Sequence, residues 1–179
     1  MDVAKVRIAG VVQDSVTDGP GLRFVVFAQG CRHKCTGCHN PDTWSTDGGT
    51  DWTVDYLLEL FDKNPLTSGI TLSGGEPFLQ APALFSFVKA VRKREIISGR
   101  KIEIAIYTGF LFEDLVSLSA PSEYHLLLEL CDVLIDGRFD IEKKSLDLKF
   151  RGSHNQRIID IKTSLASNML VLMQDKRWV

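Results

Sequence analysis

One apolar segment runs directly into three closely spaced cysteines: Leu22-Arg23-Phe24-Val25-Val26-Phe27-Ala28-Gln29-Gly30-Cys31-Arg32-His33-Lys34-Cys35-Thr36-Gly37-Cys38-His39-Asn40. Residues 22–28 have the nearly continuous apolar pattern of a strand that is buried on both faces. Strands of this kind are typical of parallel sheets, in which sites gather at the carboxyl ends of the strands. The stretch therefore predicts an α/β fold with the cysteines at one rim of the sheet.

The rest of the chain alternates predicted strands and helices. Further strands are predicted over residues 6–12, 69–72, 101–107 and 133–135, and helices over 54–61, 84–97 and 111–130, the last interrupted near Pro121. This alternation favours a mostly parallel sheet with outer helices. A full eight-unit barrel typically needs about 250 residues. The 179 residues of this chain therefore predict an open, partial (β/α) barrel.

Local signals refine two helices and leave the C-terminal region open. Asp51 or Thr53 is available as the N-cap of the first helix, and the second carries one apolar stripe formed by Leu84, Phe87, Val88 and Val91. Residues 158–161 and 170–173 have strand-like composition, but nothing fixes their pairing. We expect one domain over residues 1–179, with a core partial barrel over 18–150 and a C-terminal extension over 151–179.

Composition excludes several classes of function. The chain has 21 Lys and Arg against 23 Asp and Glu, so no global positive field would attract nucleic acid or a membrane surface. No apolar run approaches the length of a bilayer span, and residues 1–5 lack the form of a signal peptide. We therefore expect a cytoplasmic protein, whose four cysteines are metal ligands or core residues rather than disulfides.

The three loop cysteines are candidate ligands of an iron–sulfur cluster. Electron-carrier clusters normally use four cysteines. Three thiolates with C-x3-C-x2-C spacing would hold three corners of a cubane cluster and leave its fourth iron open to a small molecule. The alternative is a structural zinc site completed by His33 or His39. Cys131, between a predicted helix and a strand, is expected to be a buried core thiol.

A second candidate element follows the 69–72 strand: Ser73-Gly74-Gly75-Glu76-Pro77. Adjacent glycines at a strand end let backbone amides approach a carboxylate or hydroxyl of a ligand, although an ordinary strand-to-helix turn would use the same residues. Thr108-Gly109 and Asp136-Gly137 follow two further predicted strands. All these segments should converge with the cysteine loop on one rim.

Together these residues resemble the radical S-adenosylmethionine enzymes that activate glycyl-radical enzymes. The C-x3-C-x2-C spacing is the signature of that superfamily. The resemblance covers most of the chain and implies an open partial barrel of the radical S-adenosylmethionine type. Its other segments, in order, are Asp18-Gly19-Pro20-Gly21-Leu22-Arg23, Cys38-His39-Asn40-Pro41-Asp42-Thr43-Trp44, Ser73-Gly74-Gly75-Glu76-Pro77 and Tyr107-Thr108-Gly109-Phe110.

Within that group the chain is most similar to the activators of anaerobic (class III) ribonucleoside-triphosphate reductases. Its size is similar, and Gly37 stands where most of the superfamily has an aromatic residue and this subgroup has Gly. Two later segments resemble the Asp-Gly-Lys-Phe and Arg-Gly-Ser-Ser-Asn-Gln segments of the subgroup: Asp136-Gly137-Arg138-Phe139 and Arg151-Gly152-Ser153-His154-Asn155-Gln156-Arg157. His154 departs from the expected Ser, which leaves the role of the second segment open.

The resemblance implies a [4Fe–4S] cluster held by Cys31, Cys35 and Cys38, with S-adenosylmethionine on the fourth iron. One electron would then break the C5′–S bond, and the 5′-deoxyadenosyl radical would take a hydrogen atom from a glycine Cα of the partner reductase. No side chain need act as an acid or base. The implied contacts with S-adenosylmethionine come from Gly37, Cys38, His39, Gly74, Gly75, Glu76 and, more weakly, Asp136.

Alternatives stay open for several of these residues. Glu76 could face the amino group of the ligand or serve as a helix-start carboxylate, and Asp136 could bind the ligand or simply make a turn. His39 could contact adenine through its backbone or shield the loop, and Trp44 is expected to pack against that loop. The implied partners are the reductase and a flavodoxin or similar reductant. The basic run Arg92-Lys93-Arg94 is either a solvated helix face or a contact for one of them.

Two other functions remain possible on the sequence. An activase of another glycyl-radical enzyme, such as pyruvate formate-lyase, would share the 38–44 segment, although that activase is longer. A zinc-stabilised interaction module would explain three cysteines and a histidine, but not the turn at residues 73–77.

Overall fold

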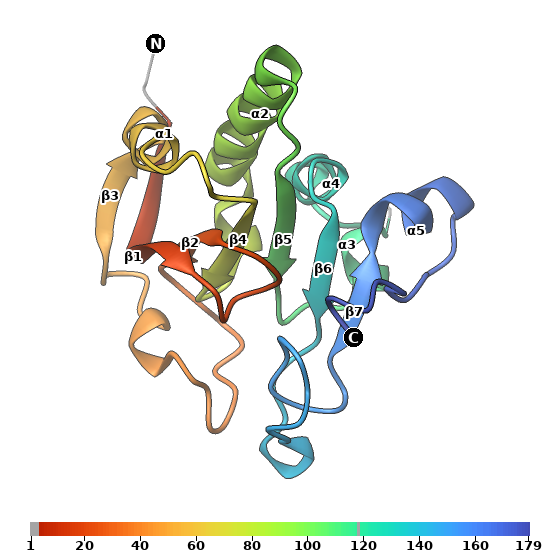
Figure 1. Ribbon diagram of the computed structural model, residues 1–179. Helices are drawn as coiled ribbons and strands as arrows, with labels where there is room; N and C mark the ends of the chain where they lie inside the picture. Colours follow the sequence, from red (N-terminus) through yellow and green to blue (C-terminus); the bar gives the residue numbers. More distant parts are fainter. Residues whose placement is uncertain (1–3, 118) are drawn as a thin grey trace.

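The computed structural model describes residues 4–117 and 119–179, which fold around one open sheet of seven strands (Figure 1). The strands are β1 (Lys5–Ser15), β2 (Arg23–Ala28), β3 (Thr50–Thr53), β4 (Gly69–Gly74), β5 (Glu103–Tyr107), β6 (Val133–Asp136) and β7 (Arg157–Asp160). The helices are α1 (Val54–Asp62), α2 (Ala81–Ser98), α3 (Phe112–Leu115), α4 (Ser122–Glu129) and α5 (Ile161–Ser167). The predicted α/β class is confirmed.

The sheet is parallel only at its centre. Its strand order is β3-β1-β2-β4-β5-β6-β7. The neighbours β2, β4, β5 and β6 are parallel, whereas β1 is antiparallel to both β2 and β3, and β7 is antiparallel to β6. Three of the six pairings are therefore parallel, and the expected mostly parallel sheet is limited to the middle strands. Adjacent parallel strands need a long crossover connection, usually a helix, whereas the antiparallel strands at the two edges of the sheet can be joined by loops alone.

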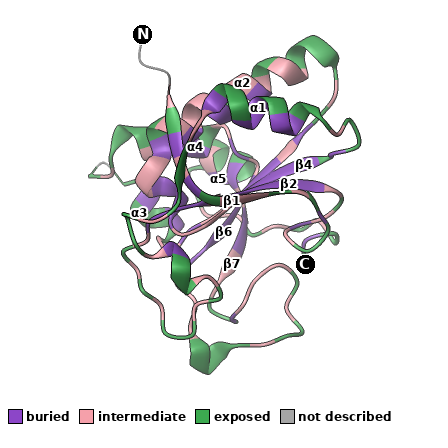
Figure 2. Cartoon of the chain, turned by 90° about the vertical axis from the view of Figure 1, so that its left-hand side faces the viewer, coloured by how far each residue is buried: buried purple, intermediate pink, exposed green. Residues whose placement is uncertain are grey.

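Alternate side chains of the central strands pack on opposite faces of the sheet. Ile104 and Ile106 of β5 pack into the larger core beneath the helices, whereas Ala105 faces a smaller core on the opposite face. The stripe predicted on α2 is confirmed, since Leu84, Phe87, Val88 and Val91 are fully buried. Figure 2 shows this layering as buried strands beneath helices whose outer turns are exposed.

The C-terminal region fills the second face of the sheet. Trp178 is fully buried there, beside Ile135, Ile158 and Phe150. The expected strand at 158–161 exists as β7, but Ile161 begins α5, whose N-cap Asp160 accepts a hydrogen bond from the amide of Thr163. The other expected strand, 170–173, forms one isolated bridge between Leu172 and Ile159.

Two local expectations can be compared directly with the structure. Thr53, not Asp51, caps α1, because its hydroxyl accepts a hydrogen bond from the Tyr56 amide at 3.1 Å. In the described part of the segment before Pro121 the short helix α3 forms, and α4 follows that proline. Strand β3 was not predicted, since its four residues have no periodic apolar signal and are held by pairing with β1. Within residues 4–117 and 119–179, none of the helices has the length and apolar character that a bilayer crossing needs.

Candidate functional site

The loops after the central parallel strands surround one open pocket of about 350 Å³. In Figure 1 the cysteine-bearing loop after β2 and the long loop after β6 extend from the same end of the sheet. The pocket wall also includes the glycine turn after β4 and the Thr108-Gly109 turn after β5. The predicted convergence of these segments on one rim is therefore confirmed.

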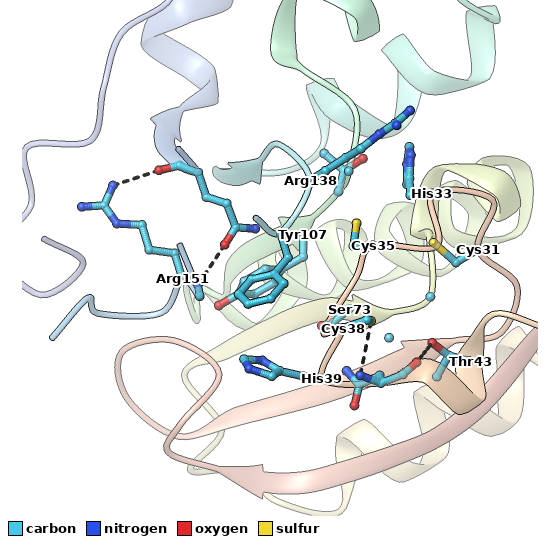
Figure 3. A pocket seen from close by; sticks show the side chains of 18 of the residues that line it. Cys31, His33, Cys35, Cys38, His39, Thr43, Ser73, Tyr107, Arg138 and Arg151 are labelled. Carbon is cyan, nitrogen blue, oxygen red and sulfur yellow. Dashed lines mark hydrogen bonds between the residues drawn. The ribbon is translucent and has the colours of Figure 1, made fainter. Parts of the chain in front are cut away.

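All three loop cysteines face this pocket as free, partly buried thiols (Figure 3). The loop is held at its start by the amide of Gly30, which donates to the Thr43 carbonyl at 2.8 Å, and by that of Cys31, which donates to the Trp44 carbonyl at 3.1 Å. Inside the loop, the Cys38 amide donates to the Cys35 carbonyl at 3.1 Å. Burial is the main reason why the pKa of the Cys31 thiol is raised above its ordinary value.

This donor set fits an iron–sulfur cluster better than a single zinc ion. Among the residues that the structure describes, no three His, Cys, Asp or Glu side chains form a group that could hold one metal ion. A cubane cluster takes each thiolate on a different iron, so its ligands stand farther apart than those of a single ion, and these three thiols face one cavity. The two histidines of the zinc alternative are engaged elsewhere: His33 contacts Glu76, and the ring of His39 lies 5.4 Å from that of Phe139.

The glycine turn packs tightly against the start of the cysteine loop. A Cβ on Gly74, which has φ +95°, would lie 2.6 Å from the Ala28 nitrogen, and one on Gly75 would lie 2.4 Å from the Gly30 carbonyl oxygen. The amides of Gly75 and Glu76 donate to the carbonyls of Ala28 and Gly30 at 2.7 and 2.8 Å. Glycine is required at both positions because a side chain would clash with the backbone at the end of β2 or at the start of the cysteine loop. The amides of Gly75 and Glu76 already have partners, and contacts from this turn to a ligand stay a prediction.

The carboxylate of Glu76 is only 1% exposed and is not among the residues that line the pocket, although its partners His33, Thr108 and Gly109 are. It accepts hydrogen bonds from the Phe78 amide, the Thr108 hydroxyl, the Gly109 amide and the His33 ring. The bond from Phe78 is the helix-start role considered for Glu76 above, since Glu76 caps the 3-10 turn Pro77–Gln80. Its expected contact with the amino group of a ligand stays a prediction.

Two other residues expected to contact the ligand are also not among those that line the pocket. Asp136 is fully buried and accepts hydrogen bonds from the Nε of Arg157 at 2.9 Å and from the amide of Phe112 at 2.8 Å. Gly37 is exposed and lies beside the loop after β6, where a Cβ on it would meet the side chains of Ile141 and Phe139. By contrast His39, Gly74 and Gly75 do line the pocket with the cysteines.

Two nitrogen donors in the pocket wall were not identified from the sequence. The indole Nε1 of Trp44 and the guanidinium Nε of Arg151 are buried, and neither has a hydrogen-bond partner among the described residues. Both residues line the pocket, with Arg151 across from the cysteines in Figure 3. An unpaired buried donor costs about 1–3 kcal/mol, and both nitrogens are shielded from solvent in this arrangement. Arg151 lies in the 151–157 segment described above, but nothing in the sequence of that segment indicated that Arg151 would line the pocket.

Comparison with known proteins points to the same part of the chain. The family described as "4Fe-4S single cluster domain" matches residues 17–159. Anaerobic ribonucleoside-triphosphate reductase-activating proteins of Enterobacteria phage T4 and Vibrio cholerae are each 35% identical to the chain, over 150 and 147 residues. These matches cover 79% and 80% of this chain and 85% and 90% of the two relatives.

A pyruvate formate-lyase-activating enzyme is also similar, over a shorter region. The protein from Clostridium pasteurianum is 40% identical over 97 residues, which cover 50% of this chain and 40% of that enzyme. The reductase-activating proteins therefore match the chain over most of its length, whereas this similarity is confined to half of it.

Proposed function

The chain belongs to the family of anaerobic ribonucleoside-triphosphate reductase-activating proteins, and we propose that it generates the glycyl radical of such a reductase as a radical S-adenosylmethionine activase. The observation that carries this proposal is the set of three thiols that face one pocket at the end of β2. The fourth cysteine of the chain, Cys131, is fully buried in the core and far in sequence from the loop. The donor set is therefore the one that leaves an iron open.

Cys31, Cys35 and Cys38 would hold the [4Fe–4S] cluster in this proposal. The chemistry that the cluster and S-adenosylmethionine supply when bound is reductive cleavage to methionine and a 5′-deoxyadenosyl radical, which abstracts a hydrogen atom from a glycine Cα. The chain itself supplies placement and shielding. Phe139 and Ile141, from the loop after β6, lie beside the cysteine loop at Gly37.

The pocket has the chemical character that S-adenosylmethionine requires. Its carboxylate, ribose hydroxyls and adenine nitrogens can accept hydrogen bonds, and the pocket wall includes Trp44 and Arg151, whose buried Nε1 and Nε donors would meet such acceptors after a small side-chain movement. His39, Gly74 and Gly75 lie on the same wall as the cysteines and would contribute the contacts expected from the family resemblance. Contacts from Gly37, Glu76 and Asp136 are expected from the same resemblance, and these three residues are not among those that line the pocket.

We also propose that the sheet is the open partial barrel of the radical S-adenosylmethionine type, formed by a single domain over residues 1–179. Its support is the run of four parallel central strands with the site loops at their carboxyl ends. An open rim suits a substrate that is a polypeptide loop of another protein. A flavodoxin or similar protein would supply the electron, and a cytoplasmic location would keep the four thiols reduced.

The test is anaerobic electron paramagnetic resonance on iron-reconstituted protein mixed with S-adenosylmethionine, reductant and the anaerobic reductase. The expected result is a glycyl-radical doublet on the reductase that is absent when any component is omitted and in the Cys35→Ala variant. Cys131→Ala is the matched control and should keep the doublet. A doublet that forms only on pyruvate formate-lyase would favour the alternative activase, and stoichiometric zinc without iron would contradict both.

A further inference from the structure

His33 lies in the middle of the cysteine loop, between the first two thiols, and its side chain is directed into the protein. The side chain is 7% exposed, although the neighbouring Arg32 and Lys34 are exposed. Its Nε2 lies 2.8 Å from the Oε2 atom of Glu76. Because an ionised carboxylate can only accept, the imidazole Nε2 carries the hydrogen in this bond.

The partner carboxylate is fixed by two other segments of the rim. Glu76 also accepts from the Thr108 hydroxyl at 2.9 and 3.0 Å, from the Gly109 amide at 2.8 Å and from the Phe78 amide at 3.1 Å. A carboxylate offers about four acceptor sites. Four donor groups therefore occupy Glu76, and the bond from His33 joins the cysteine loop to the turns after β4 and β5.

The space around the imidazole is shaped to hold this ring. A Cβ on Gly109 would lie 2.3 Å from the Cδ2 atom of His33, so the backbone of that turn lies directly against the ring. The ring of Phe110 contacts it edge-on, with the two centroids 4.8 Å apart. His33 is thus held by packing on one side and by a charge-assisted hydrogen bond on the other.

Among residues 4–117 and 119–179, the bond from His33 to Glu76 is the one hydrogen bond that joins residues 32–34 to a neighbouring segment. The backbone bonds to the Thr43-Trp44 segment are made at the start of the loop, by Gly30 and Cys31. Within the described part of the chain, no backbone hydrogen bond joins residues 32–34 to another segment. The side chain of His33 is therefore the contact that fixes the turn between Cys31 and Cys35.

We propose that His33 is a positioning residue, which anchors the cysteine loop to the ends of β4 and β5 through the buried Glu76 carboxylate. The loop is then held in place before any metal arrives, and the thiols of Cys31 and Cys35 keep their spacing. The consequence for the cluster rests on the proposed function, whereas the anchoring of the loop does not. Glu76 acts here as a structural acceptor rather than as a ligand of the pocket.

Hydrogen exchange on the cluster-free protein tests the anchor by itself. In His33→Ala the amides of residues 32–38 should exchange about tenfold faster or more, because a charge-assisted hydrogen bond contributes at least that factor to a local opening. His33→Gln, whose amide nitrogen can replace Nε2, should restore much of the protection. His125→Ala is the matched control, since His125 also pairs with a glutamate, at 3.2 Å from Glu129, but is 48% exposed.

Iron retention tests the consequence for the cluster. After anaerobic reconstitution, His33→Ala should lose iron to a chelator about 10- to 100-fold faster than the wild type, the range typical of residues that orient metal ligands. His33→Gln should be intermediate, and His125→Ala should match the wild type. If the wild type itself takes up no cluster, the proposed function fails, and the exchange experiment still decides the role of His33.

Two results would overturn the proposal. Unchanged exchange at residues 32–38 in His33→Ala would mean that the loop does not depend on this contact. Faster exchange across the whole chain, without recovery in His33→Gln, would mean that the substitution only lowers global stability. If His33→Ala does not fold, His33→Phe keeps a ring against Gly109 and Phe110 but removes the Nε2 donor, and unchanged exchange at residues 32–38 in that variant would also overturn the proposal.

Discussion

The guanidinium of Arg23 lies 5.4 Å from the ring centre of Trp178, so that the first residue of β2 is stacked against the C-terminal end of the chain. Both side chains are fully buried. Arg23 also donates to the Thr71 hydroxyl and the Ile70 carbonyl, each at 2.6 Å. Burial is the main influence on Arg23 and lowers its pKa despite the nearby Glu103 carboxylate. The strand that leads to the cysteines is therefore packed, at its first residue, against the C-terminal end of the chain.

Trp178→Ala should destabilise the protein by about 3–5 kcal/mol, the usual cost of deleting a buried aromatic side chain. Part of this loss comes from removing the ring that packs against the buried Arg23 guanidinium. Trp178→Phe keeps most of the stack and should cost much less. Urea unfolding followed by circular dichroism measures both values. A loss below about 1 kcal/mol for Trp178→Ala would contradict the packing role assigned to this residue.

Gly75→Ala should destabilise the rim, because its Cβ would lie 2.4 Å from a backbone oxygen that cannot rotate away. Overpacking of this kind typically costs about 1–3 kcal/mol. Gly10→Ala is the matched control, since no atom lies within 4 Å of its added Cβ. Urea midpoints compare the two variants, and equal midpoints would show that the turn can move away from Gly30.

The carboxylate of Asp132 should contribute stability that is lost in acid. Burial acts to raise its pKa, but hydrogen bonds from Lys162 and Arg92 outweigh burial and hold that pKa below its usual value. A lowered folded-state pKa stabilises the protein above the unfolded pKa of about 3.9, and this stability is lost as pH falls through the folded pKa. Asp132→Asn should therefore cost about 1–3 kcal/mol at neutral pH and progressively less below about pH 4.

Urea unfolding of the wild type and Asp132→Asn between neutral pH and about pH 3 measures this difference. Asp147→Asn, at an exposed position, serves as control. A difference between the wild type and Asp132→Asn that stays constant across the range would mean that Asp132 is not the titrating group.

Cys131 should resist alkylation in the folded, cluster-free protein while the three loop cysteines react. Burial raises the pKa of Cys131, so little of it is the reactive thiolate. Cys31, whose pKa is also raised mainly by burial, should need a higher pH than a free cysteine. Mass spectrometry after timed treatment with iodoacetamide reports each site. Rapid modification of Cys131 without unfolding would contradict its place in the core.

Trp44→Phe and Arg151→Met should each weaken binding of S-adenosylmethionine about tenfold, which corresponds to about 1.4 kcal/mol. The reason is that each variant removes a buried donor that has no partner among the described residues. Iron content should stay unchanged, because neither residue holds the cluster. Equilibrium binding to the reconstituted protein measures the effect, and Trp52→Phe is the control outside the pocket. Unchanged affinity in both variants would exclude these donors from the site.

The sequence by itself determined the central strands, the buried face of α2 and the rim on which the cysteines lie. Each of these depends on a pattern within a few residues: an apolar run such as Phe24–Ala28, a helical stripe such as that ending at Val91, or the spacing of three cysteines. Such patterns are local because secondary structure and its buried face repeat at fixed intervals along the chain.

Only the tertiary structure decided which partners the polar groups of the site have. Glu76 meets His33 across 43 residues of sequence, and Asp136 meets Arg157 across 21. Trp44 and Arg151, which lie far apart in the sequence, both line one pocket. Strand β3 likewise exists through its pairing with β1. A hydrogen bond depends on the distance and direction between two groups, and those are set by the packing of whole elements rather than by the pattern around either residue.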